Sequence, residues 1–428
     1  MTGTILLTKT FFRGIIIDKE ALSMLQRTEY LKKLDLWREK KVIKVITGIR
    51  RCGKSTLLRQ YAEFLKKNGT AEKQIVFLNF EEMENERLLD PGELYAYITE
   101  RFCGESPLYI FLDEVQKVRD FEKVVDSLFV KENTDIYITG SNSYLLSGEL
   151  ATYLSGRYIE IPMLPFSFSE YAALHDTGET DKMFMSYVRS GGFPYLASLK
   201  DAGDEIADTY LEGIYNTVLV KDIEERSERR SDGNRAVKDV TMLKNISRYL
   251  ASNIGSAVSG RSITGAIVSS GVKVSQNTVL SYIDALKESF VFYPCERFDV
   301  TGKQLLETNG KMYIVDSGLR RFIVPKRSYD IGHVLENIVF LELKRRGCSV
   351  YVGKLQKLEV DFVTEKGGEY SYWQVTASML EESVFEREMA PLAAINDNYP
   401  KTVLTLDRFS DGNYNGIKVV NVIDWLLG

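Results

Sequence analysis

The sequence predicts an α/β protein whose first part holds a five-stranded, mainly parallel sheet. Two observations support this class: strand-like runs alternate with stretches of helical periodicity, and a glycine-rich loop follows the first strand. The expected strands cover residues 41–48, 74–80, 108–114, 135–141 and 157–163. Since helical stretches lie between strands, the sheet should be parallel and covered on both faces.

The chain has 428 residues, more than one ordinary core accommodates. We expect three regions: residues 1–165 with an N-terminal helix over 20–40 and the sheet, a mostly helical region over 166–325, and a second α/β region over 326–428. Residues 259–299 show the order helix, turn, longer helix and strand, which is typical of a winged helix-turn-helix.

Composition narrows the function classes. The formal net charge of −5 indicates that the whole chain is not an electrostatic nucleic-acid binder, although one region can still carry a basic patch. Four cysteines lack the spacing of a zinc site, and two histidines are too few for a histidine-rich metal centre. No uncharged apolar run approaches the roughly 20 residues that span a bilayer, so we expect a cytoplasmic protein without a membrane partner.

The stretch Gly48-x₄-Gly53-Lys54-Ser55 has the pattern of a phosphate-binding P-loop between a strand and a helix. Its glycines let backbone N–H groups close around phosphate oxygens, Lys54 reaches the outer phosphates, and Ser55 binds Mg²⁺. The predicted ligand is therefore ATP with Mg²⁺. The expected nucleotide-binding residues are Gly48, Ile49, Arg50, Arg51, Cys52, Gly53, Lys54, Ser55 and Thr56.

An acidic pair at the end of a later strand supplies the second half of such a site. The run YIFLDE ends in Asp113 and Glu114. We expect Asp113 to hold the Mg²⁺ shell and Glu114 to orient and polarise the attacking water.

Two further positions are candidates for sensing or stabilising the terminal phosphate. Ser141 or Asn142 follows the next strand and can contact that phosphate, or can simply make local turn contacts. Arg157 can act as an arginine finger in its own chain or toward a neighbouring subunit, or can be a solvated surface residue. An oligomer is therefore possible from the sequence.

Several longer motifs resemble one known group of proteins. The segments TGIRRCGKSTLL, IFLDEVQKV, the run from ITGSNS to PFSFSEY, and GGFPYL are similar to prokaryotic AAA-type P-loop ATPases called ATP-binding proteins. The C-terminal half of those proteins is a domain of uncharacterised function. The resemblance implies that an extra strand lies between the P-loop strand and the strand ending in Asp113. It also implies a winged helix and then a restriction-endonuclease-like domain.

That nuclease-like domain implies a weaker second metal site. Glu336, Asp361 and Gln374 match its carboxylate and amide positions, but Thr376 stands where the lysine that aligns or activates water belongs. Lys344 or Lys357 are candidates for a migrated lysine. We therefore predict a catalytically inactive domain.

The sequence is compatible with three biological roles. The first hypothesis is an ATP-driven switch or motor acting on or near double-stranded DNA, with residues 275–288 as the recognition helix. The alternative is an ATP-controlled signalling scaffold that binds protein partners without nucleic acid. A second alternative is an ATP-coupled nuclease.

Overall fold

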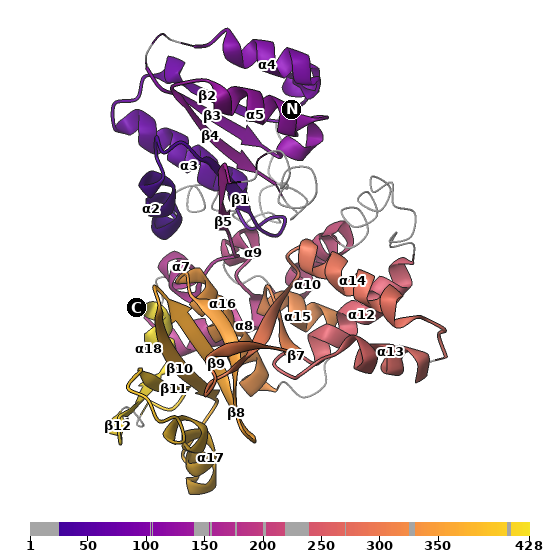
Figure 1. Cartoon of the computed structure of the whole chain (residues 1–428), viewed down its shortest axis with the longest axis vertical. Coiled ribbons are helices and arrows are strands. Elements are labelled where there is room, and N and C mark those ends of the chain that lie inside the picture. Colours follow the sequence, from indigo (N-terminus) through magenta and orange to yellow (C-terminus); the bar gives the residue numbers. More distant parts are fainter. Residues whose placement is uncertain are drawn as a thin grey trace, which may run out of the picture.

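Two β-sheets organise the chain, and a set of helices lies between them (Figure 1). The computed structural model describes residues 25–428, apart from 103, 105, 141–153, 155, 176–177, 200–202, 219–238, 270, 325–329 and 409–411. Among the described residues, no helix has both the length and the apolar character that crossing a membrane requires.

The first sheet has five strands in the order β2-β3-β4-β1-β5, and all neighbouring pairs are parallel. Its strands are β1 (Ile43–Thr47), β2 (Ile75–Asn79), β3 (Leu108–Asp113), β4 (Thr134–Thr139) and β5 (Tyr158–Pro162). The structure thus confirms the predicted five-stranded parallel sheet. It also confirms that an additional strand, β4, separates the P-loop strand β1 from β3.

Helices cover both faces of this sheet because its strands are apolar on both sides. The covering helices are α2 (Thr28–Leu36), α3 (Lys54–Lys67), α4 (Pro91–Thr99) and α5 (Phe121–Val130). Along β3, Tyr109 and Phe111 join the apolar cluster that contains α3. The alternate residues Ile110 and Leu112 join the cluster that contains α4 and α5. Successive side chains of β3 therefore lie on opposite faces of the sheet, and each face packs against its own set of helices.

A helical region follows the first sheet. Its helices are α7 (Phe168–Leu174), α8 (Thr180–Ser190), α9 (Pro194–Ala197), α10 (Asp204–Asn216), α12 (Val240–Ser252), α13 (Gly260–Ser269), α14 (Gln276–Glu288) and α15 (Ser317–Ile323). Between α14 and α15 runs an antiparallel hairpin of β6 (Phe292–Asp299) and β7 (Gln304–Ile314). The order of α13, α14 and hairpin follows the order expected from the sequence.

The second sheet has eight strands in the order β12-β13-β11-β10-β9-β8-β6-β7. Besides β6 and β7, it contains β8 (Ser349–Leu355), β9 (Leu358–Lys366), β10 (Glu369–Thr376), β11 (Lys401–Thr405), β12 (Gly412–Tyr414) and β13 (Ile417–Asn421). The helices α16 (Ile331–Arg345), α17 (Glu382–Ala393) and α18 (Val422–Leu427) pack around it. Because β6 pairs with β8, this sheet joins strands from both sides of residue 325, where the sequence suggested a boundary.

Candidate nucleotide site

The glycine loop is held in a shape that its glycines permit. Gly48 has a φ of 141°, and a Cβ atom there would lie 2.1 Å from the carbonyl oxygen of Met163. Gly53 has a φ of 102° and directly precedes the first residue of α3. Both values lie in the region that favours glycine, so the loop can turn tightly from β1 into a helix N-terminus.

Lys54 places its positive charge inside this loop. Its side chain is buried, with 4% of the residue exposed. The ammonium group donates to the carbonyl oxygens of Gly48 at 2.8 Å and Ile49 at 3.1 Å. The loop is therefore closed around its own lysine, and an anion entering it meets a desolvated cation and the N-terminus of α3.

Asp113 lies at the end of β3, and its two carboxylate oxygens have different surroundings. Its Oδ1 accepts from the Thr139 hydroxyl at 2.6 Å, whereas its buried Oδ2 has no hydrogen-bond partner in the described part of the chain. Burial raises the pKa of Asp113, and the hydroxyls of Thr139 and Ser55 oppose that rise. A buried carboxylate oxygen beside a serine hydroxyl suits the oxygen-ligand chemistry of Mg²⁺.

Glu114 follows in a left-handed backbone conformation, with a φ of 55°. Its backbone nitrogen donates to the Thr139 hydroxyl at 3.0 Å, and its carboxylate accepts from the side-chain amide of Gln116. Glu114 also lines the cavity in front of the loop. Thr139 thus fixes both members of the acidic pair. Sequence analysis missed this role, although Thr139 lies within the predicted strand 135–141 and is the last residue of β4.

A cavity of about 1060 Å³ opens in front of the loop. One wall consists of P-loop residues, and the opposite wall comes from α9 and α10. On that wall, Tyr195 and Tyr210 have ring centroids 4.8 Å apart. Burial raises the pKa of Tyr210 to about 12, and nearby Arg51 opposes the rise. The helical region therefore closes the site from the side opposite the sheet.

The structure brings most of the predicted nucleotide-binding residues to this cavity. The lining residues from the loop and α3 are Arg50, Arg51, Gly53, Lys54, Ser55 and Thr56. Ile49 and Cys52 are fully buried in the apolar core and do not line the cavity, so they contribute packing and backbone groups. Gly48 contributes the carbonyl oxygen that accepts from Lys54.

Of the remaining candidates in the first region, the structure describes Arg157 alone. Ser141 and Asn142 fall outside the described residues. Arg157 pairs with Asp126 on α5, its side chain is 43% exposed, and it is absent from the cavity lining. The described geometry therefore offers no contact between Arg157 and the site of its own chain.

An arginine that sequence analysis missed connects the loop to the helical region. Arg27 is 4% exposed and donates to the carbonyl oxygens of Cys52 at 3.3 Å and Leu164 at 2.9 Å. Its guanidinium also pairs with Glu170 of α7 at 2.8 Å. Burial opposes ionisation of Glu170, but Arg27 outweighs burial and holds the pKa of Glu170 below its ordinary value.

The second candidate site lies where α16, β9 and β10 meet. Glu336 and Asp361 both contact Lys311 of β7. The backbone nitrogen of Asp361 donates to Gln374 Oε1 at 3.3 Å, and Gln374 Nε2 donates to Glu388 at 2.9 Å. The three predicted residues are thus brought together.

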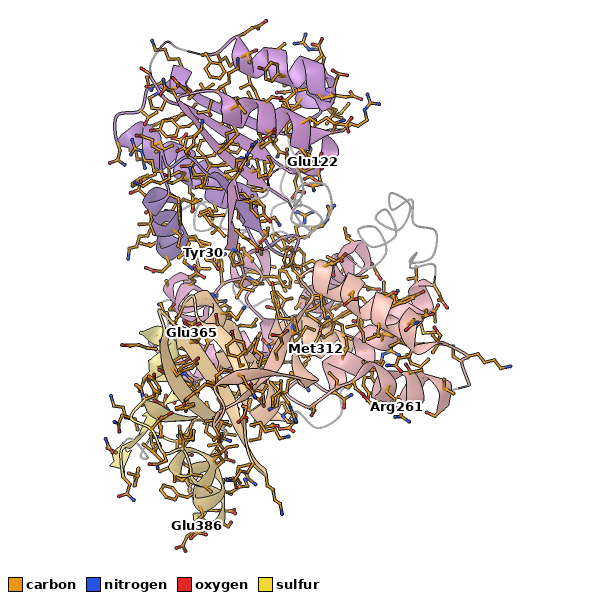
Figure 2. The ribbon with its side chains drawn as sticks, viewed as in Figure 1. Tyr30, Glu122, Arg261, Met312, Glu365 and Glu386 are labelled. Atoms are coloured by element: carbon orange, nitrogen blue, oxygen red, sulfur yellow. The ribbon has the colours of Figure 1, made fainter. Side chains whose placement is uncertain are left out.

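The lysine of this second site is one that sequence analysis did not identify. Thr376 directs its hydroxyl to the carbonyl oxygen of Ser378 at 3.0 Å. Lys344 and Lys357 are exposed, whereas Lys311 is buried and touches the carboxylates. Figure 2 labels Met312, the next residue in β7, at the junction between the helical region and the second sheet.

The parallel sheet and the glycine loop define the class of this protein, a P-loop NTPase of the AAA type. The AAA domain family matches residues 40–172, and a domain of unknown function, DUF8612, matches residues 181–329. An uncharacterized protein of Haemophilus influenzae is 40% identical over 410 residues, which cover 95% of this chain and 99% of that protein. The chain therefore belongs to the same family as this bacterial protein, and residues 40–172 form its AAA domain.

More distant similarities extend over much of the chain. An uncharacterized protein of Methanocaldococcus jannaschii is 28% identical over 375 residues, which cover 83% of this chain and 79% of that protein. This chain is also similar to the structure of the Aeropyrum pernix ORC1 protein in complex with DNA. The matched region covers 79% of this chain and 96% of the ORC1 chain, with 13% identity and a TM-score of 0.30. For AMPPCP-bound DnaA from Aquifex aeolicus, the matched region covers 61% of this chain and 86% of the DnaA chain, with 15% identity and a TM-score of 0.29. Scores this low support no inference about ligand or partner.

Proposed function

We propose that the chain binds ATP with Mg²⁺ in the cavity between the glycine loop and α10, and hydrolyses it. The observation that carries this proposal is the buried Asp113 Oδ2, which has no hydrogen-bond partner in the described structure. It lies at the edge of the sheet where Lys54 already holds a buried positive charge. Burying a carboxylate oxygen without a hydrogen-bond donor raises the free energy of the folded chain unless a bound cation interacts with that oxygen.

Each residue of the site has a defined task in this proposal. Lys54 binds the outer phosphates, while Ser55 and Asp113 hold Mg²⁺. The bound Mg²⁺ neutralises charge on the phosphate oxygens. Glu114 accepts hydrogen bonding from the attacking water and polarises it. Thr139, at the end of β4, holds Asp113 and Glu114 in place at the end of β3.

The opposite wall of the cavity would bring the bound nucleotide into contact with the helical region. Tyr195 and Tyr210 provide an aromatic surface suited to stacking against a purine ring. Because this wall belongs to α9 and α10, the presence of nucleotide changes the free energy of contact between sheet and helices. We therefore propose a nucleotide-driven switch or motor.

Glu114→Gln tests this proposal by separating binding from turnover. Gln keeps the shape of the side chain but cannot polarise water as a carboxylate does, so the variant should bind ATP normally and hydrolyse it far more slowly. Fluorescent-nucleotide binding and phosphate release measure the two properties. Wild-type turnover in this variant would assign the water-activating role to another group.

We further propose that the switch acts on double-stranded DNA. The exposed start of α14 offers Gln276, Asn277 and Thr278, which can donate to phosphates or base edges. The helices α13 and α14 followed by the β6–β7 hairpin have the order of a winged helix-turn-helix. This proposal is tested by measuring Mg²⁺-dependent ATP turnover with and without double-stranded DNA. A rate that changes when DNA is added would support it, and an unchanged rate would count against it.

A second candidate partner is a protein. This alternative is favoured by three exposed apolar side chains on or near α13 and α14: Val268 is 49% exposed, Val272 36% and Leu280 40%. Salt separates the two partners, because phosphate-led DNA affinity falls steeply as salt concentration rises. If the chain does not bind DNA even at low salt, the protein partner is favoured.

A further inference from the structure

Lys311 lies at the centre of the carboxylate cluster in the second sheet. Its ammonium nitrogen is 2.9 Å from Glu336 Oε1, 3.0 Å from Glu359 Oε1 and 3.8 Å from Asp361 Oδ1. Only 5% of its side chain is exposed. A buried lysine with three carboxylates around it is held in its charged form, and these carboxylates outweigh burial and raise the pKa of Lys311.

The oxygens that a divalent metal would need already face protein donors. Glu336 Oε1 accepts from Lys311 and from the Tyr313 hydroxyl, and Glu336 Oε2 lies 3.8 Å from His333 Nδ1. Asp361 Oδ2 accepts from the backbone nitrogen of Val375 at 2.9 Å, and its Oδ1 faces Lys311. A metal that binds carboxylate oxygens at about 2.0–2.6 Å would have to displace the ammonium group.

The backbone of the helical region covers the same carboxylate. Gly255 follows α12 with a φ of 70°, and a Cβ atom there would lie 2.7 Å from Glu336 Oε2. The backbone nitrogen of Gly255 donates to the carbonyl oxygen of Met312 at 3.4 Å, which fixes this turn against β7. Only 8% of the Glu336 side chain is exposed. A phosphodiester therefore cannot approach Glu336 from the side of the helical region.

We infer that Lys311 is a built-in cation that replaces the divalent metal of the nuclease-like domain, so that the cluster fastens β7 to α16 and β9 and does not cleave phosphodiesters. The residues implied by the resemblance are in place, but they do not fit a metal together with Lys311. This inference goes beyond the proposed ATPase, because it concerns a cluster outside the nucleotide cavity.

Removal of the ammonium group should convert the cluster into a metal site. We propose to measure Mn²⁺ binding by electron paramagnetic resonance and melting temperature in Mn²⁺ and in EDTA, without nucleotide. The full chain is compared with Lys311→Met, Lys311→Met/Asp361→Asn and Asp361→Asn, and Lys357→Met serves as an exposed-lysine control. Lys311→Met should gain one bound Mn²⁺ per chain and melt at a higher temperature in Mn²⁺. The double variant should lose both effects.

Two results would overturn the inference. The first is Mn²⁺ binding or DNA cleavage by the wild-type chain that disappears in Asp361→Asn. The second is the absence of any Mn²⁺ response in Lys311→Met. If Lys311→Met does not fold in EDTA, recovery of the folded chain in Mn²⁺ supports the inference, and failure to recover counts against it.

Discussion

The Thr139 hydroxyl lies 2.6 Å from Asp113 Oδ1 and also accepts from the backbone nitrogen of Glu114 at 3.0 Å. One side chain on β4 therefore positions both acidic residues at the end of β3. The parallel register makes this possible, because Leu112 pairs with Ile138 and the two strands end side by side. The two strands thus act as one unit in the proposed magnesium site.

Thr139→Val should make nucleotide binding more sensitive to acid. Asp113 must be ionised to hold Mg²⁺, and burial already raises its pKa, so affinity for Mg²⁺-ATP should fall as pH decreases. The hydroxyl favours the ionised form, and its loss should move the midpoint upward by about one to two pH units. Titrations of Mg²⁺-ATP across pH measure this midpoint. Thr134→Val, at the other end of β4, should leave it unchanged, and equal midpoints for Thr139→Val and wild type would refute the proposed role.

Arg27→Ala should destabilise the folded chain. The substitution leaves Glu170 largely buried without its guanidinium partner, and breaking such a pair costs about 3–5 kcal/mol in the free energy of unfolding. Lys32→Ala, which breaks the exposed pair with Glu29, should cost at most about 1 kcal/mol. Denaturant unfolding measures both values. Similar losses for the two variants would show that the Arg27 contacts do not hold the loop to α7.

Arg157→Ala tests the remaining arginine across a subunit boundary. Since Arg157 does not line the cavity of its own chain, we expect it to act on a neighbouring subunit or not at all. In the first case the variant should lose about 10³-fold in turnover. Mixing Arg157→Ala with Lys54→Ala chains should then recover part of the activity, because some interfaces hold one intact site. Co-assembled mixtures without recovery would exclude the role toward a neighbour.

Local patterns made the first half of the site predictable from the sequence. Gly48 to Ser55 adopt the loop shape that their spacing predicts, and α3 begins at Lys54 as expected for a phosphate-binding loop. The acidic pair also ends a strand as predicted. These features depend on neighbours in the chain, and the order of apolar and polar residues encodes them directly.

Contacts between distant segments could not be predicted in the same way. Lys311 reaches Glu336 only because the β6–β7 hairpin joins the second sheet, and Arg27 reaches Glu170 across 143 residues. The sequence offered one signal for each, a charged residue beside an apolar run, but nothing that identified its partner. Proximity in sequence to the carboxylates therefore favoured Lys344 and Lys357 as candidates, whereas Lys311 is the lysine that contacts Glu336.

Calorimetric titration of Mg²⁺-ATP into wild type and Lys54→Ala tests the central proposal most directly. Lys54 is buried inside the loop, and loss of its charged hydrogen bonds to phosphate, about 1.5–3 kcal/mol, should weaken binding about 10- to 150-fold. Lys67→Ala, which removes an exposed lysine at the other end of α3, is the matched control and should bind like wild type. Equal affinity of Lys54→Ala and wild type, or a wild-type chain that does not bind Mg²⁺-ATP, would contradict the assignment of this loop as the nucleotide site.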